Sequence, residues 1–165
     1  TPDIIVMGKG IGNGYPLSAV VARREVAEAM VERKFFNTYG SNPMSCSAGR
    51  AVLRVIEEDN IMANVTEAGD HLAVQMVGLM DKYEVIGDFR GRGLMRAVEF
   101  VKDRTTKEPG TAEASRVQES CRESGVIVGR GGRYGNILRI NPPLCANKGD
   151  MQLLADALDK GCSQL

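Results

Sequence analysis

The chain carries near its start the stretch Ile4-Ile5-Val6-Met7-Gly8-Lys9-Gly10-Ile11-Gly12-Asn13-Gly14-Tyr15-Pro16. Its first four residues are apolar and are typical of a buried strand, and the residues that follow are rich in glycine. Glycine allows the backbone to approach a flat ligand closely, and it adopts dihedral angles that other residues resist. The stretch therefore predicts a buried strand that leads into a ligand-binding loop.

Lys9 is the residue in this loop whose side chain is best suited to covalent chemistry. A lysine at the end of a buried strand is easily desolvated, and desolvation favours the neutral amine. A neutral amine is a nucleophile, and its usual use is a Schiff base with a carbonyl such as that of pyridoxal phosphate. The alternative is a solvated loop lysine, because lysine is mostly exposed in proteins.

The loop departs from the two common nucleotide-binding motifs. A dinucleotide fingerprint requires a third glycine, but Asn13 and Tyr15 stand at the two positions where it would fall. A P-loop requires serine or threonine after its Gly-Lys pair, and Gly10 follows Lys9. Pro16 and the apolar run after it predict a turn into a second buried strand rather than a helix.

Composition excludes several classes of function. The 21 basic and 21 acidic residues balance, so no net charge favours nucleic acid or an anionic membrane. No apolar run approaches the roughly 18 residues of a membrane-spanning helix. The single histidine, His71, argues against a zinc site or a histidine-based triad. The cysteines lie far apart and predict buried, reduced thiols in an intracellular protein; they are Cys46, Cys121, Cys145 and Cys162.

The first part of the chain alternates strands and helices. We expect strands at 4–7 and 17–22 and a helix over 24–34. Asn42 followed by Pro43 predicts the start of another helix, with an amide N-cap and proline at the first helical position. Because the first residue is Thr1 rather than Met, and Pro2-Asp3 leads at once into a buried strand, we expect the chain to be the C-terminal part of a longer protein.

A long helical pattern follows, and the run 57–60 marks a break or bend in it. Beyond Gly87 we expect a smaller α+β unit. Within that unit the sequence predicts strands at 95–101, 126–128 and 137–140, a glycine-rich loop over 129–136, and helices over 112–124 and 148–164. The predicted domains are thus 1–45 (part of a large domain), 46–84 (a bridging helix region) and 85–165 (a small α+β domain).

Three motifs occur in a fixed order along the chain. They are Gly8-Lys9-Gly10-x-Gly12-x-Gly14-x-Pro16, Asn37-Thr38-Tyr39-Gly40-x-Asn42-Pro43-x-x-Cys46 and Arg90-Gly91-x-Gly93-Leu94-Met95. In these motifs the chain resembles the class III, ornithine aminotransferase-like aminotransferases, from Pro2 almost to its end. The residues of these motifs are most similar to those of the mitochondrial alanine–glyoxylate aminotransferase branch. The resemblance implies an α/β fold: the C-terminal part of a fold type I pyridoxal phosphate-dependent transferase.

The resemblance also assigns roles to three residues. Lys9 is similar to the lysine that forms the internal aldimine with pyridoxal phosphate and then moves the proton from the substrate Cα. Thr38 resembles the threonine that binds the cofactor phosphate in the other subunit's site, which implies a C2 homodimer. Arg139 matches the arginine that binds the substrate carboxylate through two parallel hydrogen bonds. The implied substrates are an amino acid and an oxo acid.

Simpler interpretations exist for two of these residues. Thr38 on its own also fits the approach to a helix, and Arg139 on its own also fits an edge-strand arginine in water. Arg130 and Arg133 are expected to be solvated, although either could contact substrate. Arg96-Ala97 departs from the family pattern and puts the local strand packing in doubt. The resemblance places the family's acidic partner of the pyridine nitrogen outside this chain.

The expected activity is transamination, with alanine and glyoxylate as the substrates that the branch suggests. The alternatives are a different pyridoxal phosphate reaction, such as that of an aminomutase or decarboxylase, and an inactive dimerisation fragment. We expect the isolated chain to be inactive, because part of the cofactor's surroundings is absent from it. The branch implies a mitochondrial location, with a cytoplasmic one as the alternative.

Overall fold

The computed structural model describes all 165 residues. The chain divides into two compact units, Thr1–Asn60 and Ile61–Leu165. The first unit contains two strands, one short turn of 3-10 helix and two α-helices. The second contains four strands and three α-helices. The division of a longer protein into domains at residues 45 and 84 stays a prediction.

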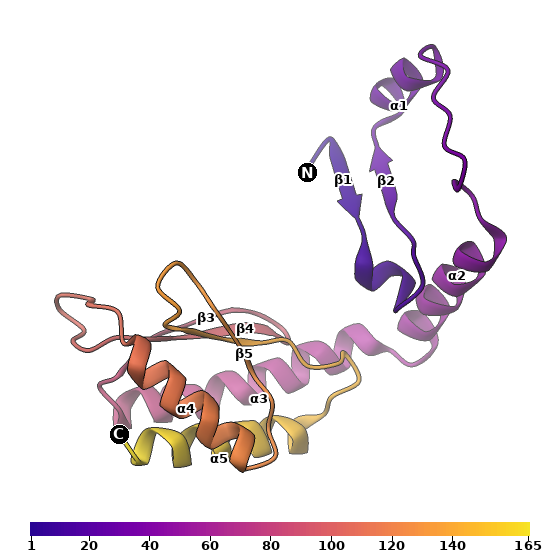
Figure 1. Ribbon diagram of the computed structural model, residues 1–165. Coiled ribbons are helices and arrows are strands. Elements are labelled where there is room, and N and C mark those ends of the chain that lie inside the picture. Colours follow the sequence, from indigo (N-terminus) through magenta and orange to yellow (C-terminus); the bar gives the residue numbers. More distant parts are fainter. The chain divides into compact units, whose positions relative to one another are not determined.

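The first unit is built on a two-stranded antiparallel ribbon (Figure 1). Strand β1 (Ile4–Met7) pairs with β2 (Ala19–Ala22), and Val6 lies opposite Val20 in the register. The glycine-rich loop joins the two strands and contains the 3-10 turn η1 (Lys9–Gly12). The ribbon confirms the expected strand that leads into a loop. Its expected burial is wrong for residues 4–6 of this chain, which are exposed, and the single helical turn was not expected.

Strand β2 begins two residues later than the expected strand over 17–22. Leu17, just before the strand, packs instead on helix residue Gly49, where an added Cβ would stand 2.4 Å from the Leu17 Cδ2. Helix α1 (Arg24–Val31) ends three residues before the expected end at Lys34. Lys34 has a φ of 49°, in the left-handed region, and therefore cannot continue a right-handed helix.

Helix α2 (Pro43–Glu58) begins where the sequence predicted. The Oδ1 atom of Asn42 accepts hydrogen bonds from the backbone N–H groups of Met44 at 3.0 Å and Ser45 at 3.2 Å. Pro43 occupies the start of the helix, where its missing N–H costs nothing. The amide cap and the proline together explain why the helix begins at this residue.

The expected break in the long helical pattern is confirmed. Helix α2 ends at Glu58 and α3 (Ile61–Lys82) begins three residues later. Between them Asn60 has a φ of 50°, a left-handed conformation that ends an α-helix and that asparagine tolerates. The boundary between the two units falls at this residue.

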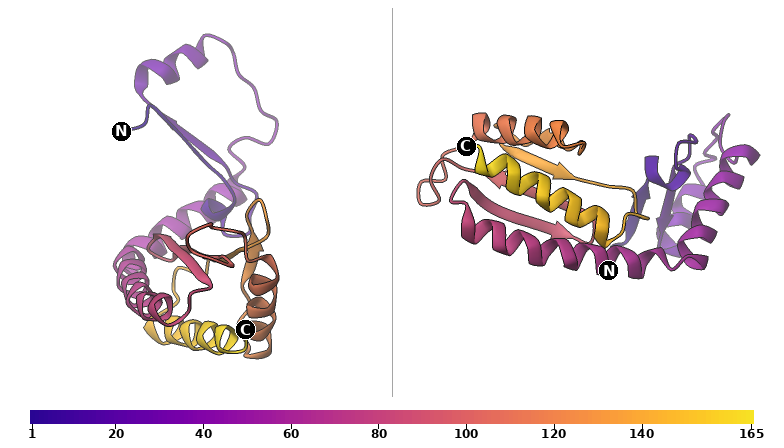
Figure 2. Two further views of the ribbon diagram at one scale, coloured as in Figure 1. Left: turned by 90° about the vertical axis from the view of Figure 1, so that its left-hand side faces the viewer. Right: turned by 90° about the horizontal axis from the view of Figure 1, so that it is seen from below.

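The second unit is a four-stranded antiparallel sheet with helices on one face (Figures 1 and 2). Its strands are β3 (Ile86–Arg92), β4 (Met95–Phe100), β5 (Gly129–Gly131) and β6 (Ile137–Ile140), in the spatial order β3-β4-β6-β5. Helix α3 packs on β3, while α4 (Thr111–Glu123) packs on β4, β5 and β6. Helix α5 (Lys148–Ser163) packs against both of these helices.

The apolar core lies between this sheet and its helices. Its most completely buried side chains come from all three helices and from the strands; they are Leu72, Met76, Ile86, Val98, Phe100, Val117, Leu138 and Leu158. Burial of large aliphatic side chains stabilises a domain by roughly 1.5–3 kcal/mol for each side chain. The second unit therefore has a core of its own.

The expected strand over 126–128 is wrong, because the strand lies at 129–131 instead, inside the expected loop. The backbone of 126–128 is bound to helix α4 and not to a neighbouring strand. The N–H of Val126 donates to the carbonyl of Cys121 at 2.8 Å, and the side chain of Gln118 donates to the carbonyl of Val128 at 2.9 Å. Pairing with β6 becomes possible only from Gly129 onward.

Arg96, which departs from the family pattern, is accommodated in the packing of β4. Its guanidinium donates to the carbonyls of Gly93 and Gly91, both at 2.8 Å, and to that of Gly69 at 3.3 Å. It also lies 5.4 Å from the centre of the Phe89 ring. Arg96 thus joins the β3–β4 hairpin to helix α3.

The four cysteines are all free thiols, but only two of them are buried. Cys121 and Cys162 lie in the core, where burial raises the pKa of the Cys121 thiol to about 11 and that of Cys162 to about 12. The expectation of burial is wrong for Cys46 and Cys145, which are exposed. Among the helices of the chain, none combines the length and the apolar character that crossing a membrane requires.

Candidate functional site

Lys9 lies in the loop between β1 and β2, at the first residue of η1. Its φ of 51° falls in the left-handed region, which is uncommon for a residue with a side chain. Such conformations often occur at functional sites, where surrounding structure maintains the strain. Five other non-glycine residues of the chain share the feature, so it supports a role for Lys9 without singling it out.

The surroundings of Lys9 within this chain are open. Its side chain is exposed, so residues 1–165 do not supply the desolvation that the sequence predicted. A Cβ added at Gly8 or Gly10 would meet no atom within 4 Å. The backbone on both sides of the amine is therefore accessible to a flat ligand.

The loop that carries Lys9 is anchored on helix α2. Gly12 is buried, and a Cβ at Gly49 of α2 would lie 3.7 Å from the carbonyl oxygen of Ile11 and within 2.4 Å of the Leu17 side chain. A glycine on the helix therefore allows the loop to approach closely. The role of Gly49 was not predicted, because a lone glycine in a helical pattern gives no indication of which segment packs on it.

Thr38 lies in a turn between α1 and α2. The turn is held by Asn37, whose Oδ1 accepts from the N–H of Tyr39 at 3.1 Å and whose carbonyl accepts from the N–H of Gly40 at 3.1 Å. The Thr38 side chain is exposed and takes part in none of the chain's side-chain hydrogen bonds. Its hydroxyl is thus free to donate to a ligand oxygen.

Arg139 occupies the middle of β6 in the second unit. In the register it lies between Ala97 of β4 and Gly129 of β5. It is exposed and forms none of the ion pairs of the chain, whereas Arg90 binds both Asp88 and Glu99 at 2.6 Å. The free guanidinium of Arg139 can accept a carboxylate from elsewhere.

Arg130 lies on the other face of the sheet from Arg139. Arg130 is paired with Leu138, which is fully buried under the helices, and neighbouring residues of a strand point to opposite faces. Arg133 stacks over the ring of Tyr134 at 5.6 Å in the hairpin loop. The register therefore places Arg130 away from the face of the sheet that carries Arg139.

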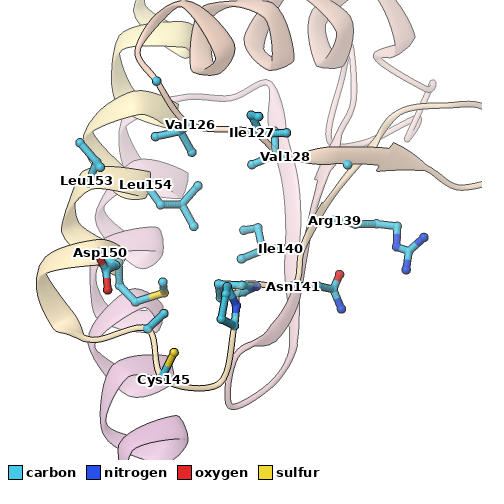
Figure 3. A pocket seen from close by; sticks show the side chains of 16 residues that line it. Val126, Ile127, Val128, Arg139, Ile140, Asn141, Cys145, Asp150, Leu153 and Leu154 are labelled. Carbon is cyan, nitrogen blue, oxygen red and sulfur yellow. The ribbon is translucent and has the colours of Figure 1, made fainter. Parts of the chain in front are cut away.

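A cavity of about 770 Å³ lies beside Arg139 in the second unit. Its walls are mostly apolar and come from β6, from the segment before β5 and from α5; they include Val126, Val128, Ile140, Met151 and Leu154. Figure 3 shows the guanidinium of Arg139 pointing away from these side chains. The cavity is therefore not the carboxylate site that the sequence predicted.

Lys9 and Thr38 thus belong to the first unit, and Arg139 belongs to the second. Each is exposed and has an uncommitted polar group. The sequence analysis missed Gly131, whose absent side chain leaves room for Arg139. The alternation Gly129-Arg130-Gly131 would have indicated it only if these residues had been recognised as a strand.

Comparison with known proteins gives consistent results over the whole chain. A mitochondrial alanine–glyoxylate aminotransferase 2 homolog from Arabidopsis thaliana is 47% identical over 164 residues, which are 99% of this chain and 34% of the relative. The chain thus spans about a third of the length of this curated relative. Such relatives are named aminotransferases and mitochondrial.

Two solved structures extend the comparison to the fold. A phospholyase from Arthrobacter in complex with phosphoethanolamine matches with a TM-score of 0.94 and 31% identity, over 100% of this chain and 39% of its own. An amine transaminase from an uncultivated Pseudomonas species, in its pyridoxal phosphate-bound internal aldimine form, matches with a TM-score of 0.88 and 31% identity. It covers 99% of this chain and 38% of its own.

These matches confirm the expected fold class, a mixed α/β chain that corresponds to part of a pyridoxal phosphate-dependent transferase. They also indicate pyridoxal phosphate as the cofactor. A family model described as aminotransferase class-III matches residues 1–161. On this evidence of sequence and fold together, the chain belongs to the class-III aminotransferase family.

Proposed function

We propose that the full-length protein transfers an amino group from an amino acid to an oxo acid, with alanine and glyoxylate as the first pair to test. The observation that carries the proposal is Lys9, an exposed amine between two unobstructed glycines, in a chain of the class-III aminotransferase family. The name of the Arabidopsis relative suggests the substrate pair and the mitochondrial location.

The residues of this chain fit pyridoxal phosphate. No atom of the chain lies within 4 Å of a Cβ added at Gly8 or Gly10, so the backbone beside Lys9 would not obstruct a flat ring. The Thr38 hydroxyl is unengaged and can donate to a phosphate oxygen. We propose that Thr38 does so in the partner subunit's site, so that a homodimer is the active unit.

The cofactor, when bound, supplies an aldehyde that captures amines and a ring that takes up electrons released at the substrate Cα. Lys9 would hold it covalently through Nζ. Nζ of Lys9 would also accept the proton of the substrate Cα and so act as a general base. Arginine could not replace it, because a guanidinium stays protonated. Arg139 would orient the substrate by binding its carboxylate.

The test of this proposal is Lys9→Ala in the full-length protein. We expect transamination to fall by more than about 100-fold, because general base catalysis alone typically contributes that much. Borohydride reduction of the wild type in the presence of cofactor should link the cofactor permanently to Lys9, and the attached cofactor serves as the label. Lys34→Ala is the matched control, since Lys34 is also exposed and left-handed at φ 49°. Retained turnover in Lys9→Ala, or a label on another residue, would contradict the proposal.

A second candidate function is a phospho-lyase reaction on the same fold. It is favoured by the match to the phosphoethanolamine-bound phospholyase, which extends over 100% of this chain. A transaminase converts alanine and glyoxylate to pyruvate and glycine, whereas a phospho-lyase releases inorganic phosphate from phosphoethanolamine. Phosphate release without formation of glycine would favour the lyase, and Lys9→Ala would abolish either activity.

A further inference from the structure

The uncovered face of the second unit's sheet carries a row of residues around Arg139. The pairing places Arg90, Ala97, Arg139 and Gly129 side by side across β3, β4, β6 and β5. The two residues that flank Arg139 are thus an alanine and a glycine. Arg90 at one end of the row is already bound to two carboxylates, so Arg139 is the arginine of this row that is left without one.

The side chain of Arg139 lies along β5 and passes over Gly131. A Cβ added at Gly131 would stand 3.2 Å from Cδ of Arg139 and 3.9 Å from its Cγ. A Cβ added at Gly129 would stand 3.8 Å from Cβ of Arg139, which is an ordinary contact. A Cβ at 131 would therefore press on the stem of the arginine, which would have to move by a few tenths of an ångström, and a larger side chain would displace it further.

The backbone gives no reason for glycine at position 131. Gly132 and Gly135 of the same hairpin have φ of 83° and 66°, which favour glycine, but Gly131 is not among the positive-φ residues. A glycine in a strand also weakens the strand, because it has no side chain to pack. What Gly131 supplies is room on the outer face, and Arg139 fills it.

We propose that Gly131 is a positioning residue that holds the Arg139 guanidinium where it binds the carboxylate of the substrate. This inference rests on the role proposed above for Arg139. A guanidinium and a carboxylate form two parallel hydrogen bonds only when their planes are aligned, so the direction of the arginine stem decides the strength of binding. A side chain at 131 turns the stem away from β5 and misaligns the pair.

The proposal is tested in the full-length holoenzyme with Gly131→Val and Gly131→Ala, and with Gly129→Ala as the matched control. Valine is favoured in strands, and no positive φ opposes it, so the fold tolerates the change. We expect Gly131→Val to raise KM for the amino acid and the inhibition constant of propionate by about tenfold, since a displacement near 1 Å can cost up to 100-fold. Gly129→Ala should leave both constants unchanged.

The pattern of kinetic effects separates positioning from mere destabilisation. Loss of an interaction that is equally strong in the ground state and in the transition state raises KM and leaves kcat unchanged. Propionate reports on carboxylate binding alone, because it has no amino group. The melting temperature of Gly131→Val should stay at the wild-type value or rise. A fall in melting temperature together with equal loss of kcat would overturn the proposal, and so would an unchanged inhibition constant in both Gly131 variants.

Arg139→Ala distinguishes failure of this inference from failure of the proposed function. If Arg139→Ala raises the inhibition constant of propionate and Gly131→Val does not, Gly131 is no positioning residue. If Arg139→Ala itself leaves that constant unchanged, the carboxylate role of Arg139 is wrong, and the inference falls with it. If both variants raise the constant and Gly129→Ala does not, the positioning role holds.

Discussion

The pKa of a side chain in this protein depends on its hydrogen-bond partners. Asp159 of α5 is an example, because its Oδ1 accepts from Nζ of Lys82 at 2.7 Å and from the Tyr83 hydroxyl at 2.8 Å. The hydrogen bond from Lys82, followed by that from Tyr83, lowers the pKa of the Asp159 carboxyl below its ordinary value of 3.8. The three groups join the end of α3 to α5.

The Asp159 cluster predicts a stability loss in acid. A carboxyl whose pKa is lowered by folding stabilises the native state above its unfolded pKa, and the stabilisation disappears as the pH falls through the lower folded value. Unfolding measurements between pH 6 and pH 2 should therefore show a smaller acid-induced loss for Asp159→Asn than for the wild type. Glu123→Gln is the control, because the Glu123 carboxylate forms none of the ion pairs of the chain. Equal pH profiles for Asp159→Asn and wild type would contradict the prediction.

At the scale of elements, glycines decide how closely helix α3 approaches the β3–β4 hairpin. A Cβ at Gly69 of α3 would lie 2.4 Å from the carbonyl oxygen of Gly93 and 2.7 Å from its Cα. These are backbone atoms, which cannot rotate away as a side chain can. Arg96 binds the carbonyls of both glycines and so fixes the same contact.

Two alanine substitutions in one helix should therefore have opposite effects. Gly69→Ala should destabilise the second unit by about 1–3 kcal/mol, because it overpacks a contact between backbones. Gly78→Ala should stabilise it by about 0.5–1 kcal/mol, because a Cβ there meets no atom within 4 Å and alanine favours the helix. Urea unfolding of the two variants measures both values, and a stable Gly69→Ala would show that the hairpin can move.

At the scale of the whole molecule, the two units differ in how their apolar residues are placed. The buried hydrophobic side chains all belong to the second unit. In the first unit, Val6 and Val20 face each other across the ribbon and are 74% and 65% exposed. A two-stranded ribbon without a covering layer is at best marginally stable in water. The first unit therefore has no apolar core of its own to stabilise it.

This difference predicts how two fragments behave. Residues 61–165 alone should unfold cooperatively in urea, because they contain the complete core, whereas residues 1–60 should show no cooperative transition. Circular dichroism at increasing urea concentration makes the comparison, and ANS fluorescence reports the exposed apolar surface of 1–60. A sharp transition for residues 1–60, or none for residues 61–165, would refute it.

Local residue patterns were sufficient to predict the helix starts, most strands and the family resemblance. The Asn42-Pro43 cap and the break before Ile61 could be predicted because their causes are local, namely a side-chain acceptor and a left-handed residue. The motif around Lys9 likewise indicated the chemistry without any knowledge of packing. Lys9, Thr38 and Arg139 were all named from the sequence, and their roles stay predictions.

Which segments contact one another, by contrast, depends on how the whole chain folds. The strand at 129–131 was misplaced by three residues because Gln118 and Cys121 of α4 bind the backbone of 126–128, and that pairing leaves no periodic pattern in the sequence. The place of Arg139 over Gly131, between Ala97 and Gly129, depends on strand order and register. These relations join residues far apart in the chain, so local residue patterns cannot specify them.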